Sequence, residues 1–115
     1  MKLKAFINME NINWEWLSRN PSAIKLLEAN QEKIHWGMLS ENTAPEAMKL
    51  MEFNPEKINW YWLSRNPTIG AITVLEANQG HEQIDWCWLS RNPSAIKLLE
   101  ANPEKIVWSY LSRNP

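Results

Sequence analysis

Few side chains in this chain are of the types that catalyse reactions or bind metals, and they are widely separated. Cys87 is the single cysteine among 115 residues. A reactive thiol requires a cation or a helix N-terminus beside it, and the sequence fixes no such partner next to Cys87. His35 and His81 stand alone, without the Cys and His spacing of a zinc site. We therefore predict no catalytic residue, no metal and no cofactor, and a protein that is not an enzyme.

Serine is the other candidate nucleophile, and it recurs in a repeated motif with an asparagine two residues later. Five copies of a catalytic serine would serve no purpose. A polar binding ladder is the functional alternative. We favour a structural role, in which these side chains satisfy backbone groups where one helix gives way to the next. The set comprises Ser18, Ser40, Ser64, Ser90 and Ser112, with Asn20, Asn42, Asn66, Asn92 and Asn114.

Arginines and aromatic residues also recur in the motif, and they form the candidate interaction surface. The arginine row is broken by Glu41, and the aromatic row by Met38. Stacked repeats align such rows on one face, which suits binding of anions, protein segments or single-stranded nucleic acid. A solvated face with ion pairs between repeats is the structural alternative. The candidate residues are Arg19, Arg65, Arg91, Arg113, Trp16, Trp62, Trp88 and Tyr110.

The motif itself is the decapeptide of residues 84–93, which occurs five times with tryptophan at its third position. Each copy begins with an isoleucine, and the isoleucines of successive copies are 22, 24, 26 and 22 residues apart along the chain. We divide the single domain 1–115 into an N-terminal cap (1–11), four repeats (12–33, 34–57, 58–83 and 84–105) and a C-terminal half repeat (106–115). Periods of this length indicate tandem-repeat folds.

The sequence of each repeat predicts two short helices. In the better-defined one, Asn20 is the N-cap, Pro21 takes the first helical position, and Asn30 ends the helix in the left-handed conformation. The residues from Asn102 to Ile106 predict a tight turn or a 3₁₀ turn. Strands are excluded because Asn-Pro interrupts every candidate run. The predicted fold is all-α: an α-solenoid of short helix pairs, α or 3₁₀, in 22–26-residue repeats.

The tryptophan helices predict an internal ladder of large side chains. The first tryptophan of each motif and the leucine three residues later share one helical face, as Trp86 and Leu89 do. We expect these pairs to pack on Ile24, Leu27 and their equivalents. The second aromatic residue is about 200° round the helix, so it packs between repeats or is partly exposed. The position between the two aromatics varies and is expected to face solvent, as Glu15, Gly37, Tyr61, Cys87 and Ser109.

Composition places the chain among ordinary globular proteins, with 44% hydrophobic and 22% charged residues. The net charge of −1 gives no general attraction to nucleic acid or to anionic membranes. A matching acidic row (Glu28, Glu52, Glu76 and Glu100) also counts against nucleic acid. A single cysteine suits a reducing compartment. Neither a signal peptide nor an apolar run of about 20 residues is present, so we expect a cytoplasmic protein without membrane contact.

The repeat unit resembles tandem repeats in proteins of large DNA viruses that infect algae and amoebae. The resemblance rests on W-x-W-L-S-x-N-P-x-A-I-x-L-L-E-x-N and covers residues 12–115. It implies viral origin, a location in the host cytoplasm or the virion, and no particular activity. Residues 41–55 are also similar, more loosely, to leucine-rich variant repeats, which alternate a 3₁₀-helix and an α-helix. The tryptophans depart from that second pattern.

The function predicted from these features is a non-catalytic protein–protein interaction or scaffolding module with a protein partner of unknown identity. Two alternatives stay open. One is single-stranded nucleic-acid binding through the Arg and Trp rows. The other is self-assembly into a homo-oligomer through the C-terminal half repeat, whose tryptophan helix has no following helix to cover it.

Overall fold

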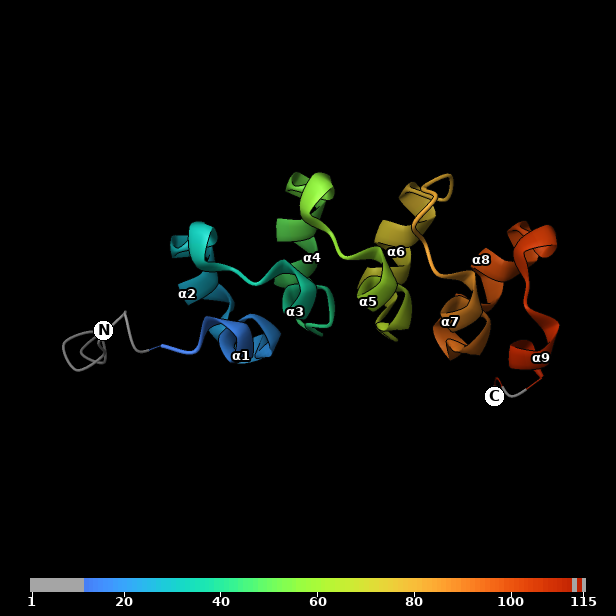
Figure 1. Cartoon of the computed structure of the whole chain (residues 1–115), viewed down its shortest axis with the longest axis horizontal. Coiled ribbons are helices and arrows are strands. Elements are labelled where there is room, and N and C mark those ends of the chain that lie inside the picture. The colour runs from blue at the N-terminus through green and yellow to red at the C-terminus, as the bar shows by residue number, and fades with distance from the viewer. Residues whose placement is uncertain (1–11, 113, 115) are drawn as a thin grey trace.

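The computed structural model describes residues 12–112 and residue 114. Within them every regular element is a helix, which confirms the all-α prediction. The molecule measures 53 × 25 × 18 Å, and its radius of gyration of 15.8 Å exceeds the roughly 13 Å of a compact domain of this length. It is therefore elongated, with its helices arranged along the long axis (Figure 1). The predicted N-terminal cap (1–11) and Arg113 lie outside the described residues.

The tryptophan helices form one row. Each starts at the first tryptophan of a motif and contacts the next in chain order: α1 with α3, α3 with α5, α5 with α7, and α7 with α9. Figure 1 shows this order from the blue to the red end of the chain. The row comprises α1 (Trp14–Arg19), α3 (Trp36–Ser40), α5 (Trp60–Arg65), α7 (Trp86–Arg91) and α9 (Trp108–Leu111).

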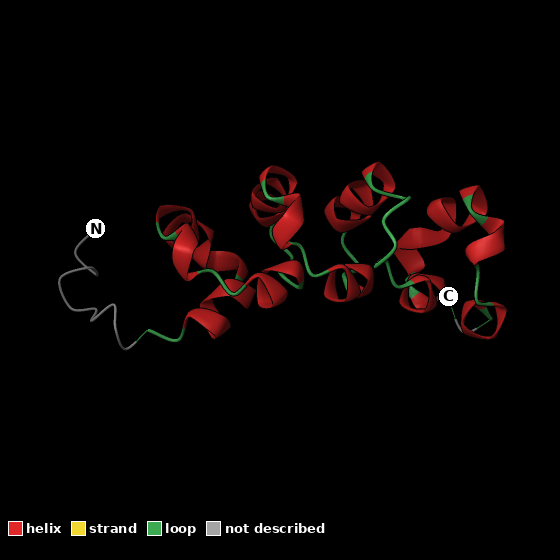
Figure 2. Cartoon of the chain, turned by 45° about the horizontal axis from the view of Figure 1, so that its top comes forward, coloured by secondary structure: helices red, strands yellow, loops and turns green. Residues whose placement is uncertain are grey.

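The remaining α-helices form a second row beside the first, as Figure 2 shows with its loops crossing from one row to the other. The row comprises α2 (Ile24–Ala29), α4 (Pro45–Phe53), α6 (Ile69–Ala77) and α8 (Ile96–Ala101). Short 3₁₀-helices lie at the junctions: η3 (Pro21–Ala23), η4 (Gln31–Lys33), η5 (Pro55–Lys57), η6 (Pro93–Ala95) and η7 (Pro103–Lys105). The 3₁₀ turn predicted after Asn102 is η7. Helix α4 contacts both α2 and α6, so neighbouring repeats meet in this row as well.

Helices of four to six residues are too short to be stable alone, and side-chain caps support them. Asn59 and Asp85 accept from the backbone N–H of the second tryptophan of their helix, at 3.1 and 3.0 Å. His35 does the same through Nδ1, which lies 3.1 Å from the N–H of Met38. The unprotonated nitrogen of an imidazole ring is a hydrogen-bond acceptor, so histidine can serve as an N-cap in place of asparagine or aspartate.

The prediction that asparagine ends the second-row helices in the left-handed conformation is wrong. Asn30 has φ −137°, and no described non-glycine residue has positive φ. Its side chain does the capping instead, because Nδ2 donates to the carbonyl of Leu26, 2.9 Å away. A helix ends with unpaired carbonyls, and an amide donor satisfies one of them without left-handed backbone. Asn54, Asn78 and Asn102 repeat the bond to Leu50, Val74 and Leu98.

The core runs between the two rows. Leu39, Leu63 and Leu89 are fully buried, as predicted for the leucine of the motif, whereas Leu17 and Leu111 at the two ends of the row are partly buried. The tryptophans fit the prediction less well, because Trp60 is 4% exposed while Trp108 is 66% exposed. Trp14, Trp36 and Trp86 are partly buried against the core. Side chains from the following junction contact three of the motif tryptophans: Lys57 lies over Trp36, His81 stacks on Trp60 and Lys105 lies over Trp86.

Candidate interaction surface

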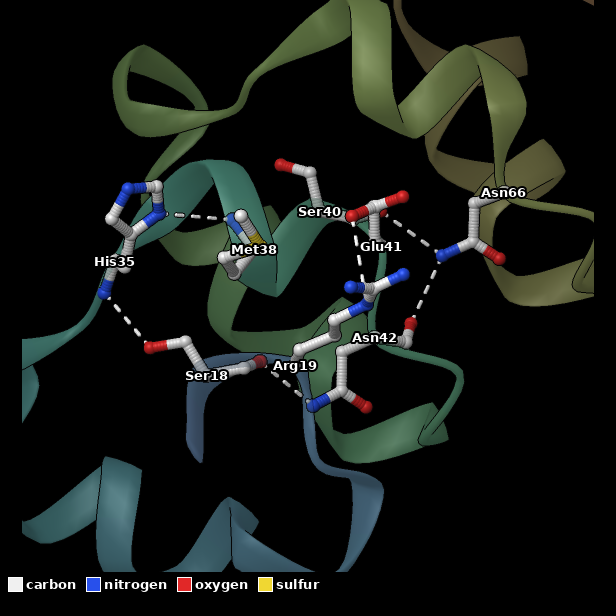
Figure 3. Close-up of polar contacts among 8 residues, drawn as sticks. All are labelled: Ser18, Arg19, His35, Met38, Ser40, Glu41, Asn42 and Asn66. Carbon is white, nitrogen blue, oxygen red and sulfur yellow. Dashed lines mark hydrogen bonds and ion pairs between the residues drawn. The ribbon is translucent and has the colours of Figure 1, made fainter. Parts of the chain in front are cut away.

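The recurrent serines hold the tryptophan helices to one another. Ser18 Oγ donates to the carbonyl of Trp14 at 2.7 Å and accepts from the backbone N–H of His35 at 2.8 Å (Figure 3). Three further serines make the same pair of bonds: Ser40 with Trp36 and Asn59, Ser64 with Trp60 and Asp85, and Ser90 with Trp86 and Val107. All four serines are fully buried. This confirms the structural role of these four serines and removes them as a binding surface, whereas Ser112 is exposed and donates to the carbonyl of Ser109 within its own helix end.

The recurrent asparagines join each repeat to the preceding one. Asn42 Nδ2 donates to the carbonyl of Ser18 at 3.0 Å, and Asn66 Nδ2 donates to those of Ser40 and Asn42 at 3.0 and 2.9 Å (Figure 3). Their Oδ1 atoms accept from the backbone two residues on, at Ala44 and Thr68. Asn92 and Asn114 also reach back to the preceding repeat. The side chains of these residues are occupied in structural hydrogen bonds, which leaves the arginine and aromatic rows as the candidate surface.

Five of the predicted surface residues come together in one place. Arg65 Cζ lies 4.7 Å from the Trp62 ring centroid and 4.3 Å from that of Trp88. Arg91 Cζ lies 4.6 Å from Trp88 and 5.7 Å from Tyr110. Aromatic rings and guanidinium groups therefore alternate along α5, α7 and α9, and we call these five residues the arginine–aromatic stack. It arises because each arginine follows its aromatic by three residues on a helix and neighbouring helices are in contact.

Tyr61 extends this stack, although the sequence placed it only among the variable outward positions. Its ring lies 5.2 Å from Trp62 and 6.3 Å from Trp88, edge-on in both cases, and Arg65 Cζ lies 5.9 Å from its centroid. Edge-to-face contacts of this kind add to the rigidity of neighbouring aromatic side chains. The available signal was its spacing, since Tyr61 precedes Arg65 by four residues and so shares its helical face.

The first predicted arginine is not part of the stack. Arg19 Nε lies 3.7 Å from Glu41 Oε1 instead (Figure 3). Glu41 stands where other repeats have arginine, and Met38 stands where they have an aromatic ring, so α3 offers Arg19 no ring to lie on. This is the inter-repeat ion pairing that the structural alternative expected, and among the described residues it occurs at this junction alone. Trp16 is 62% exposed and is likewise outside the stack.

An open hollow of about 420 Å³ lies at the same end, lined by Trp16, Arg19, Asn20 and Pro21. Its arginine is paired with Glu41, and Asn20 Oδ1 accepts from the backbone of Ser22. The hollow therefore presents one ring face and a partly neutralised cation. None of the four described lining residues has a nucleophilic side chain or a general base.

The remaining polar candidates have ordinary roles. Cys87 is exposed, as predicted for its position. His35 caps α3, and the His81 ring stacks on Trp60 at a centroid distance of 4.4 Å. Within residues 12–112 and 114, no three His, Cys, Asp or Glu side chains are grouped so as to hold a metal ion. Among the same residues, no helix is long and apolar enough to cross a membrane.

The predicted acidic row and the two stacked arginines lie on different rows of helices, and the second row also carries Lys25, Lys49 and Lys97. The acidic row predicted from the sequence lies exposed in the second row, with Glu28 on α2, Glu52 on α4, Glu76 on α6 and Glu100 on α8. Arg65 and Arg91 lie on the tryptophan helices α5 and α7. The net charge of the chain is small, but the two arginines form a local positive site on the first row. Among the described residues Arg19–Glu41 is the one ion pair within 4.0 Å, so neither stacked arginine has a carboxylate partner there.

Comparison with known proteins adds no further constraint: no family model, no curated protein and no solved structure matches this chain.

Proposed function

We propose that this chain is a tandem-repeat α-solenoid that serves as a non-catalytic protein–protein interaction or scaffolding module, with the arginine–aromatic stack as its contact surface. One observation carries the proposal. Arg65 and Arg91 are held between aromatic rings on neighbouring helices, without a carboxylate partner among the described residues. Cations of this kind that are ordered but not neutralised are available to a ligand.

The chemistry of guanidinium favours this use of the stack. Its planar face lies on aromatic rings, while its N–H donors point outward in the plane, where they can meet carboxylates or backbone carbonyls. Tryptophan, tyrosine and arginine are the residues most enriched at binding hot spots. Contact with neighbouring rings also restricts the arginine side chains before binding, which reduces the entropy lost in complex formation.

The solenoid interpretation is supported by the two rows of helices, which make equivalent contacts from one repeat to the next. Four serines and four asparagines bond equivalent positions of successive repeats, as a stacked array requires. Such arrays expose a long face to partners.

Single-stranded nucleic acid is the competing ligand, since arginine and aromatic residues also suit it. Base stacking requires free ring faces, however, and both Arg65 and Arg91 lie within 4.6 Å of the Trp88 ring centroid. A salt titration with labelled oligo(dT) and oligo(U) separates the two ligands. Tight binding at low salt that falls steeply with added salt would support nucleic acid and count against a protein partner.

Cys87 offers a direct test of the proposal. It is exposed, and it lies four residues before Arg91, so it shares a helical face with one end of the stack. A thiol-specific photo-crosslinker placed there should capture a defined protein from source extract, and Arg91→Glu should abolish the capture.

The matched control moves the thiol to the second row, as Cys87→Ser with Phe53→Cys, since Phe53 is exposed on α4. This variant should not capture the same protein. Equal capture from both positions, or capture that survives Arg91→Glu, would contradict the proposed surface.

We also propose, on the repeat motif alone, that the chain belongs with the tandem-repeat proteins of large DNA viruses, located in the virion or the host cytoplasm. Quantitative mass spectrometry of infected cells and purified particles tests this. Presence of the chain in uninfected cells at the same level would contradict it.

A further inference from the structure

We infer that Arg65 and Arg91 form a two-point site for an extended acidic segment of a partner protein, with two carboxylates on alternate residues. The inference rests on the proposed function and deepens it by naming the chemistry of the partner. The site consists of the two guanidinium groups beside the Trp88 ring, with Trp62 and Tyr110 at its two ends.

The spacing of the two cations sets the spacing of the ligand. Their Cζ atoms lie 4.3 and 4.6 Å from the Trp88 ring, so they are at most about 9 Å apart. In an extended chain, side chains on alternate residues point the same way and are separated by about 6.6 Å along the backbone. Two glutamate side chains at that separation reach both guanidinium groups with small rotamer adjustments.

The stack also selects carboxylates by geometry. A guanidinium whose face lies on a ring keeps its N–H pairs directed sideways, which is the arrangement for bidentate bonds to a carboxylate. The aromatic rings exclude water from one side of each cation, and this strengthens the ion pair relative to a fully hydrated surface pair. The neutral amide of glutamine fits the same space without the charge, so it serves as the matched negative ligand.

The site has a defined limit along the molecule. On the side of α3 the next equivalent position is Glu41, which is paired with Arg19 and would repel a third carboxylate. The acidic side chains of α2, α4, α6 and α8 lie on the other row. An acidic segment is therefore restricted to the surface of α5, α7 and α9, and it does not extend over the whole face.

The test is fluorescence anisotropy of the full chain with a short labelled peptide that has glutamate at alternate positions. Such a peptide is too short to form a stable helix. We expect saturable binding at low salt, and binding at least tenfold weaker by the same peptide with glutamine for glutamate. Arg65→Gln and Arg91→Gln should each weaken binding about tenfold. Arg65→Lys should lose most of the affinity as well, because lysine keeps the charge but not the planar fork.

Arg19→Gln is the matched control, since it removes an equal charge from a pair that lies outside the stack. It should leave peptide affinity unchanged, and circular dichroism should show all variants folded. Equal binding of the glutamate and glutamine peptides, equal losses in Arg19→Gln and Arg65→Gln, or no binding at all would each overturn the inference.

The two proposals fail separately. If the crosslinker at Cys87 captures a protein while the acidic peptide does not bind, the acidic-segment inference falls and the interaction module stands. If oligo(dT) displaces the acidic peptide at physiological salt and Cys87 captures nucleic acid instead of protein, both proposals fall.

Discussion

The side-chain amide of Asn66 donates a hydrogen bond to the main-chain carbonyl of Asn42, 2.9 Å away, and Asn42 occupies the same position in the preceding repeat. The bond thus links two copies of one residue across 24 positions of the chain. Asn66 also donates to Ser40 and accepts from the backbone N–H of Thr68. It is 2% exposed, so water does not replace these bonds when the side chain is removed.

Replacing Asn66 with alanine should therefore lower the free energy of unfolding by about 3 kcal/mol, because two buried carbonyls and one N–H lose their partner. Urea denaturation followed by circular dichroism measures this change. The matched control is Asn20→Ala, which removes the same side chain where its oxygen caps Ser22 and no bond to another repeat is present among the described residues. The control should cost about 1 kcal/mol, the usual value of a helix cap. Equal losses in the two variants would show that the inter-repeat bonds contribute nothing.

The contact of Arg65 with Trp88 joins α5 to α7 and should stabilise the fold as well as prepare the surface. A guanidinium 4.3 Å from a tryptophan ring at a half-buried position contributes about 1 kcal/mol. A double-mutant cycle with Arg65→Gln and Trp88→Leu measures this coupling from urea unfolding. Trp62→Leu with Arg19→Gln gives the reference cycle, since those two residues make no contact with each other that the structure records. A coupling near zero for the first cycle would contradict an ordered stack.

The sequence was sufficient for the all-α class, the two kinds of helix and the buried leucines, because these depend on patterns within one repeat. It was insufficient for features that depend on neighbours. The segment from Arg19 to Asn30 is identical to that from Arg91 to Asn102, yet Ile24 is 4% exposed and Ile96 is 39% exposed. Helix α2 is followed by α4, whereas α8 is the last described helix of its row. Two segments of identical sequence therefore differ in burial because their neighbouring helices differ.

The candidate site also combines features that depend on one repeat with features that depend on neighbouring repeats. The sequence predicted that the arginine and aromatic rows align on one face. It did not reveal that Arg65 also lies on Trp88 of the next helix, nor that Glu41 takes Arg19 out of the row. Those contacts depend on the lateral offset of adjacent helices, which no single repeat encodes.

The identical segments allow an internally matched stability test. Ile24→Ala should lower the free energy of unfolding by about 3 kcal/mol, as for a buried aliphatic side chain, whereas Ile96→Ala should cost about 1 kcal/mol. Local sequence and helix propensity are the same in both variants, so the difference isolates packing against neighbouring helices. Thermal and urea unfolding of the two variants measure it. Equal costs at the two positions would mean that the surroundings of α2 and α8 do not differ in the way the burial indicates.

A last prediction concerns the close approach of α4 and α6. A Cβ atom added at Gly70 would lie 2.9 Å from Cγ of Met48, which is closer than real Cβ atoms come to a neighbour. Cγ is near the backbone of α4, so a change of the outer methionine rotamers does not relieve the contact. Gly70→Ala gains about 1 kcal/mol of helix propensity, but the overlap outweighs the gain, and we expect net destabilisation of about 1 kcal/mol.

Two further variants separate the clash from propensity. A Cβ at Gly80 meets nothing within 4 Å, so Gly80→Ala should be neutral or stabilise by about 0.5 kcal/mol. In a Met48→Ala background the atom that Gly70→Ala would strike is absent, and the same substitution should then become stabilising. Urea unfolding of the four proteins in this cycle gives the sign directly. If Gly70→Ala stabilises the chain with Met48 in place, α4 and α6 are free to move apart at this point, and their contact is not the close packing that the distance indicates.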